Sequence, residues 1–201
     1  NRGLTEGLTE VISQIGVPVS EEDALSDYTI EGLLVDQISQ LVDTDVILES
    51  YFSNKGTGLL EEELSKLGHD KEKAFRIFRD IEINYHFSRN ASKQNVLGNI
   101  QSSLIDYLDE KLKKAFLNSG HEIETLTGMI NRYEQILITE EKLEKLDKDP
   151  NNFEGVKESV DKFYFLKDKY IKLMGVFELD ENIVQEPIIP KKAGFGNLLV
   201  L

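Results

Sequence analysis

The residue types that most often carry chemistry are few in this chain and widely spaced. The three histidines, His69, His86 and His121, lie far apart, and none follows a glutamate by three residues, so the Glu-x-x-His spacing of carboxylate di-metal helices is absent. There is no cysteine, which removes thiolate ligands and a thiol nucleophile. Glu82 and His86 share a face if their stretch is helical, a spacing typical of a surface contact. We therefore expect no metal site.

Glycine-rich and acidic motifs also lack the patterns of catalytic or ligand-binding loops. Gly56-Thr57-Gly58 and Gly194-Phe195-Gly196 are not followed by Gly-Lys-Ser/Thr, so neither is a phosphate loop, and no Gly-x-Ser-x-Gly elbow occurs. The run Glu61–Glu63 is typical of a solvated helix face. Asp43–Asp45 lacks the glycine and distal glutamate of a calcium loop. We expect a protein without enzymatic activity and without a cofactor.

One stretch has the composition of a nucleic-acid surface. Between Lys71 and Lys93, basic and amide side chains alternate with the rings of Phe75, Phe78, Tyr85 and Phe87. Guanidinium groups pair with phosphates while rings stack on bases, so the candidate nucleic-acid contacts are Arg76, Arg79, Arg89 and Lys93. The alternative is that the rings fill the core and leave the arginines as a solvated rim.

Charge restricts where such a contact can lie. The formal net charge is −14, but residues 1–70 hold 3 basic and 15 acidic side chains, whereas residues 71–114 hold 9 basic and 6 acidic ones. The acidic first third would repel a polyphosphate, so DNA contact is expected to be local and weakened by salt. The absence of cysteine fits a reducing compartment, and no apolar run approaches the ~20 residues that span a bilayer. We expect a soluble, intracellular protein that does not bind membranes.

The elements that position these residues are expected to be helices, which makes the fold class all-α. Residues 1–69 are expected to form an acidic cap of short helices. One ends at Gly16, one spans Ser20 to Asp27, one starts near Thr29, one spans Asp45 to Phe52 and one ends before Gly68.

Residues 70–177 are expected to form a bundle of longer helices. Residues 81–87 fit a helix but also alternate like a strand, and both alternatives stay open. Apolar residues from Leu97 to Ala115, and again from Ile123 through Leu137 to Leu146, predict a helical hairpin with a loop near Asn118 to His121. Asp149-Pro150-Asn151-Asn152 ends the second helix of this hairpin.

The clearest repeat follows that break. The a and d positions are Phe153, Val156, Val160, Phe163, Lys167, Tyr170, Met174 and Phe177, and all except Lys167 are apolar. Such a stripe requires a partner helix. It packs either on the hairpin of the same chain or on a second subunit, in which case the seven apolar residues are the oligomerisation contacts.

Residues 178–201 are expected to form an extended arm. Pro187 and Pro190 oppose helix formation, and the chain then becomes strongly apolar. A partner-docking tail is predicted from Phe195, Leu198, Leu199, Val200 and Leu201. The alternative is an ordinary strand folded onto its own domain.

Part of the chain resembles a known family. The run Gly120-His121-Glu122-Ile123-Glu124-Thr125-Leu126-Thr127-Gly128-Met129, followed by Ile136-Leu137 and Glu140-Glu141-Lys142-Leu143, lies within Asn99–Leu146. This segment, about a quarter of the chain, resembles the central hairpin of small terminase subunits from tailed bacteriophages. Tyr170–Phe177 is also similar to segments near the C terminus of some small terminases.

The resemblance implies a non-catalytic DNA-packaging adaptor that assembles as a homo-oligomeric ring and binds DNA and other packaging or virion proteins. Its expected location is the host cytoplasm or the virion. Because the first third is acidic, the DNA contact implied by the resemblance moves to Arg76–Lys93. Two alternatives remain: a structural or scaffolding protein, viral or cellular, that binds only proteins, and an acidic inhibitor that mimics DNA.

Overall fold

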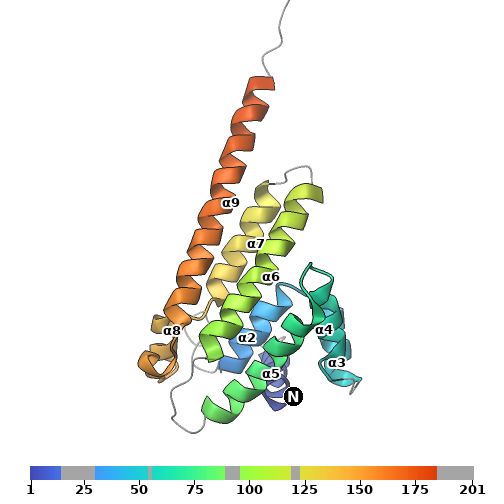
Figure 1. Cartoon of the computed structure of the whole chain (residues 1–201), viewed down its shortest axis with the longest axis vertical. Coiled ribbons are helices and arrows are strands. Elements are labelled where there is room, and N and C mark those ends of the chain that lie inside the picture. Colours follow the sequence, from blue (N-terminus) through green and yellow to red (C-terminus); the bar gives the residue numbers. More distant parts are fainter. Residues whose placement is uncertain (15–29, 54–55, 89–95, 119–122, 185–201) are drawn as a thin grey trace, which may run out of the picture.

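The chain folds into helices throughout the part that the structure describes. The computed structural model describes residues 1–14, 30–53, 56–88, 96–118 and 123–184, in which there is no strand (Figure 1). The helices are α1 Arg2–Gln14, α2 Ile30–Ser39, α3 Thr44–Phe52, α4 Gly58–Ser65, α5 Lys71–Ser88, α6 Val96–Asn118, α7 Ile123–Ile136, α8 Glu140–Lys145, the 3-10 helix η1 Pro150–Asn152 and α9 Val156–Val184. The all-α prediction is confirmed.

The short first helices and the long later ones share one hydrophobic core. Leu4 and Leu8 of α1 are buried where α1 packs on α2 and α5. α2 in turn packs on α6 and α7, and α6 packs on α9. A single cluster of buried apolar side chains therefore runs from Leu4 to Met174. The predicted boundary near residue 69 separates short helices from long ones, but it does not separate two cores.

Helix α5 decides between the two alternatives for residues 81–87. It runs without interruption from Lys71 to Ser88, so this stretch is helical. Ala74, Phe78, Ile81 and Tyr85 are buried at helical spacing. Ile83, which alternation would place beside Ile81 and Tyr85, is only partly buried. Burial therefore follows the helical period, and the alternation of apolar residues is incidental.

The second half of the hairpin differs from its prediction. The apolar pattern from Ile123 to Leu146 predicted one continuous helix, but α7 ends at Ile136 and α8 begins at Glu140. Gln101 of α6 holds the break: its Oε1 accepts from Ile138 N at 2.7 Å, and its Nε2 donates to Ile138 O at 2.9 Å. Thr139 then caps α8 by accepting a hydrogen bond from Lys142 N. A buried glutamine thus replaces the helical partners of Ile138.

Helix α9 begins next to a close contact between the backbones of Gly98 and Gly155. Gly98 of α6 lies against Gly155, and a Cβ added at Gly98 would approach the Gly155 carbonyl carbon to 2.2 Å. Gly155 also has a φ of +84°, a conformation that favours glycine. The N-terminal end of α9 is therefore held close against α6, and both positions require glycine.

Helix α9 ends later than predicted. It continues to Val184, seven residues past Phe177, so the predicted arm does not begin at Glu178. The end of α9 projects beyond the α6–α7 hairpin (Figure 1). The predicted docking tail, Phe195 and Leu198–Leu201, lies outside the described residues, as does the predicted helix from Ser20 to Asp27.

Candidate functional site on the outer face of the last helix

One face of α9 belongs to the core of its own chain. The predicted oligomerisation residues Phe153, Val156, Phe163, Tyr170 and Met174 are all buried, and Val160 is partly buried. The Phe163 ring stacks on Tyr133 of α7 with centroids 5.7 Å apart. These side chains are not exposed to a second subunit, which corrects their predicted role and supports packing within the chain. The Phe177 side chain is not among those described.

Polar contacts fix the rotation of α9 about its axis. Toward α6, Lys162 Nζ lies 2.6 Å from Asp106 Oδ1, and the Tyr170 hydroxyl donates to Asp109 Oδ1 at 2.8 Å. Burial and this bond to Asp109 raise the pKa of Tyr170. Toward α7, Lys167 Nζ lies 2.6 Å from Glu134 Oε2, which explains the polar residue in the seam. Because these contacts hold both flanks of α9, the side opposite its buried stripe is fixed as an outer face.

That outer face carries large apolar side chains. Phe165 is 76% exposed, Ile171 49%, Tyr164 45% and Leu173 37%. We call these four residues the α9 outer face. Exposed apolar groups gathered on one element are typical of protein contact surfaces. Because α9 is held to two neighbouring helices, this face is presented on a rigid support, as a specific contact requires.

The heptad pattern does not identify these residues, but the sequence contains a signal for them. Phe163, Tyr164 and Phe165 are consecutive, and three consecutive residues span about 200° around a helix. A helix that buries Phe163 must therefore expose Phe165. An aromatic residue opposite an assigned core stripe is the feature that would have predicted a second contact face.

The predicted nucleic-acid site is divided between surface and core. Phe78 and Tyr85 are buried, so part of the alternation reflects packing. Phe75 is 51% exposed and lies on α5 beside two arginines. Arg76 lies 2.5 Å from Glu72, and Arg79 lies 2.8 Å from Asp80. Both guanidinium groups therefore have partners in their own helix. The Phe87 side chain is not described, and Arg89 and Lys93 lie outside the described residues.

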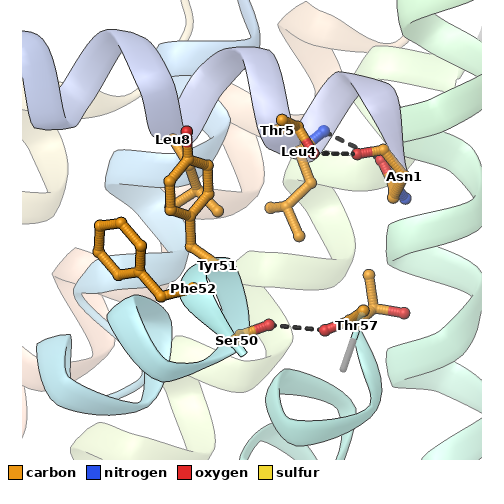
Figure 2. A pocket seen from close by; sticks show the side chains of 9 residues that line it. Asn1, Leu4, Thr5, Leu8, Ser50, Tyr51, Phe52 and Thr57 are labelled. Carbon is orange, nitrogen blue, oxygen red and sulfur yellow. Dashed lines mark hydrogen bonds between the residues drawn. The ribbon is translucent and has the colours of Figure 1, made fainter. Parts of the chain in front are cut away.

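A surface pocket of about 480 Å³ lies between α1 and the α3–α4 region (Figure 2). Its lining includes Leu4 and Leu8 from α1 and the rings of Tyr51 and Phe52 from α3. The Ser50 hydroxyl donates to Gly56 O at 2.7 Å at its edge. No carboxylate, histidine or lysine is among its described lining residues. The lining therefore mixes apolar side chains with the hydroxyl groups of Thr5, Ser50 and Thr57, and no acid–base pair is among its described residues.

Two of the described side chains that have an enclosed polar atom without a partner pack against each other. His69 Nε2 and the Tyr107 hydroxyl have no hydrogen-bond partner among the described residues, and their rings pack edge to face 4.7 Å apart. Burial, with the nearby carboxylates of Asp70 and Asp106, raises the pKa of Tyr107 to about 12. Tyr107 is therefore neutral at physiological pH. Both atoms are enclosed, so no substrate reaches them.

The described residues were compared with the requirements of metal sites and membrane spans, and the sequence and fold with those of known proteins. Within the described ranges, no group of three or more His, Asp or Glu residues is placed to hold a metal ion. No helix there combines the length and apolarity needed to cross a bilayer. Comparison with protein-family models, curated proteins and solved structures finds no match to this chain.

Proposed function

We propose that this chain is a non-catalytic oligomeric adaptor, which acts by binding further copies of itself and other proteins. The observation that carries the proposal is the α9 outer face, where Phe165 is 76% exposed on a helix anchored to both α6 and α7. Exposing four large apolar side chains to water is costly, and a partner would remove that cost. The test is native mass across a concentration series, in which a chain that stays monomeric throughout contradicts the proposal.

A finer proposal is that the adaptor serves phage DNA packaging, as a small terminase does. It is supported by the sequence resemblance across α6, α7 and α8, and by Phe75 exposed beside Arg76 and Arg79. An exposed ring near guanidinium groups combines stacking with phosphate contact. The surrounding Glu72 and Asp80 offset part of the positive charge, so the expected DNA binding is weak and strongly dependent on salt.

A gel shift at several salt concentrations tests this finer proposal. Replacing Arg76 and Arg79 with Gln should weaken DNA binding and reduce its salt dependence, because each lost phosphate contact lowers the number of released counterions by about one. The control replaces Arg132 and Lys148, both exposed elsewhere, with Gln. It removes the same charge, so equal weakening by both pairs would mean that no local site exists.

A structural or scaffolding protein that binds only proteins is the alternative. It is favoured by the ion pairs that already engage Arg76 and Arg79 within α5. The same gel shift distinguishes the DNA-packaging role from the scaffolding role. Absence of DNA binding by the unaltered protein at low salt, together with self-association, supports the scaffolding role.

A further inference from the structure

A stripe of exposed residues that runs along the outer side of α9 carries opposite charges at its two ends. Asp161, Phe165, Asp168 and Lys172 follow one another at spacings of four, three and four residues, so they lie along one stripe of the helix. All four are exposed, and the stripe runs from an acidic end at Asp161 to a basic end at Lys172, with Phe165 between them.

These charges lack partners within the described part of the chain. Three other lysines of α9 form ion pairs: Lys162 with Asp106, Lys167 with Glu134, and Lys169 with Asp109. By contrast, no ion pair with another described residue forms at Asp161, Asp168 or Lys172. The inner and lateral charges of α9 are thus used to hold the helix, and the outer ones remain for another molecule.

We propose that a second copy of this chain packs antiparallel on the outer face of α9, with Asp161 of each copy facing Lys172 of the other. In this register Phe165 of each copy faces Asp168 of the other, which sets the two Phe165 rings only three residues, about 4.5 Å, apart along the axis. The proposal rests on the proposed self-association and specifies its geometry.

The flanking apolar residues fit the same register. Tyr164 and Ile171 lie on one side of the stripe, the side nearer α7. In an antiparallel pair equivalent flanks meet, so Tyr164 of one copy lies within two residues of Ile171 of the other, about 3 Å along the axis. The Tyr164–Ile171 contact is therefore formed twice, and the two Phe165 rings meet once, at the two-fold axis.

A parallel arrangement would lose this complementarity. It would place Asp161 beside Asp161 and Lys172 beside Lys172, and like charges facing each other oppose association. Exposed ion pairs contribute little affinity by themselves but select orientation. The apolar residues thus supply the attraction in the proposed pair, and Asp161 and Lys172 determine its direction.

Cysteine pairing tests the geometry, because the chain has no cysteine of its own. Asp161→Cys and Lys172→Cys chains, mixed in equal amounts with a mild oxidant, should give a disulfide-linked dimer. Each variant alone should stay unlinked, since the two copies of position 161 would lie about 16 Å apart along the axis, beyond disulfide reach. Phe165→Cys should link with itself and reports whether this face pairs at all.

The outcomes of the cysteine experiment distinguish an error in the register from an error in the proposed function. Linkage of Phe165→Cys, with the mixed pair unlinked or with Asp161→Cys linking to itself, overturns the antiparallel register but retains self-association through α9. If Phe165→Cys fails to link and the unaltered protein sediments as a monomer, the proposed function itself is contradicted.

Charge reversal gives an independent measure of orientation. Asp161→Lys alone or Lys172→Asp alone should weaken association roughly tenfold, because two ion pairs become two like-charge contacts, and the double reversal should restore it. In a parallel pair each position faces its own copy, so a single reversal replaces one like-charge contact with another and leaves association unchanged. Unchanged association in both single variants therefore overturns the register.

Discussion

At the scale of single residues, Gln101 holds together four parts of the fold. Besides its two bonds to Ile138, its Oε1 accepts from Gln37 Nε2 at 2.8 Å and its Nε2 donates to Ser159 Oγ at 2.7 Å. α2, α6, α9 and the segment between α7 and α8 therefore meet at one buried amide. Removing Gln101 leaves the backbone groups of Ile138 without this partner and takes one hydrogen bond each from Gln37 and Ser159, which keep bonds to Ile136 and Val156; a lost buried hydrogen bond costs about 1–3 kcal/mol.

We predict that Gln101→Leu lowers the free energy of unfolding by about 4 kcal/mol, since Ile138, Gln37 and Ser159 each lose a partner. Urea denaturation followed by circular dichroism measures this change. The control is Gln135→Leu, an exposed glutamine on α7, expected to change stability by less than about 0.5 kcal/mol. Equal effects of the two substitutions would mean that the network contributes nothing.

Gly98 and Gly128 make a matched pair of helical glycines. Gly98→Ala should destabilise the protein by about 2 kcal/mol or more, because the added Cβ meets the Gly155 backbone at 2.2 Å. Gly128→Ala in α7 meets nothing within 4 Å and should stabilise by up to about 1 kcal/mol, through helix propensity alone. Thermal unfolding of both variants distinguishes the two effects, and shifts of the same sign would contradict the close approach of α6 to Gly155.

The sequence did not predict the roles of these single residues. The periodicity of apolar residues does not say that a glutamine will be buried, because Gln101 fits a solvent-facing position equally well until α2 and α9 pack around it. The role of Gly98 is likewise invisible, since it depends on a glycine far along the chain. Both are consequences of tertiary packing rather than local pattern.

At the scale of elements, the packing of the helices on one another encloses the side chains of Tyr107, Tyr133 and Tyr170. Burial raises the pKa of Tyr107 to about 12 and that of Tyr133 well above its ordinary value. Burial and the bond to Asp109 do the same for Tyr170. In the unfolded chain these phenols ionise near pH 10. The folded state therefore holds more protons above pH 10, and its stability must fall there.

We predict that the free energy of unfolding declines from pH 10 upward, each buried tyrosine contributing a slope of up to about 1.4 kcal/mol per pH unit. Tyr170→Phe should make the slope shallower. Denaturant titrations between pH 9 and 11.5 provide the measurement, and Tyr164→Phe, on the exposed side of the same helix, controls for loss of a hydroxyl. The idea fails if Tyr170→Phe leaves the slope unchanged.

Element positions were largely predictable because local pattern determines them. The expected helix from Asp45 to Phe52 is observed as Thr44–Phe52, and the stripe from Leu97 to Ala115 lies within Val96–Asn118. The break in the second hairpin helix has a tertiary cause, because Gln101 of α6 binds the backbone of Ile138. The orientation of α9 was also left open, since an apolar stripe does not reveal whether its partner helix is in the same chain.

At the scale of the whole molecule, one continuous core leaves α9 with two distinct faces. The inner face completes the fold, and the outer face, centred on Phe165, has no such role in the described chain. Our proposal therefore places self-association not at the heptad seam but on the opposite side of the same helix. We propose that protein binding accounts for this exposed face.

Sedimentation of the purified protein across a concentration series tests the central claim, self-association through the α9 outer face, most directly. The unaltered chain should form a defined oligomer, and Phe165→Glu should shift it toward monomer with helicity unchanged, because an exposed position tolerates charge in the monomer but not in the contact. Phe75→Glu, which places the same charge on the 51% exposed phenylalanine of α5, should sediment like the unaltered protein. A monomer at every concentration, or equal dissociation by both variants, would contradict the claim.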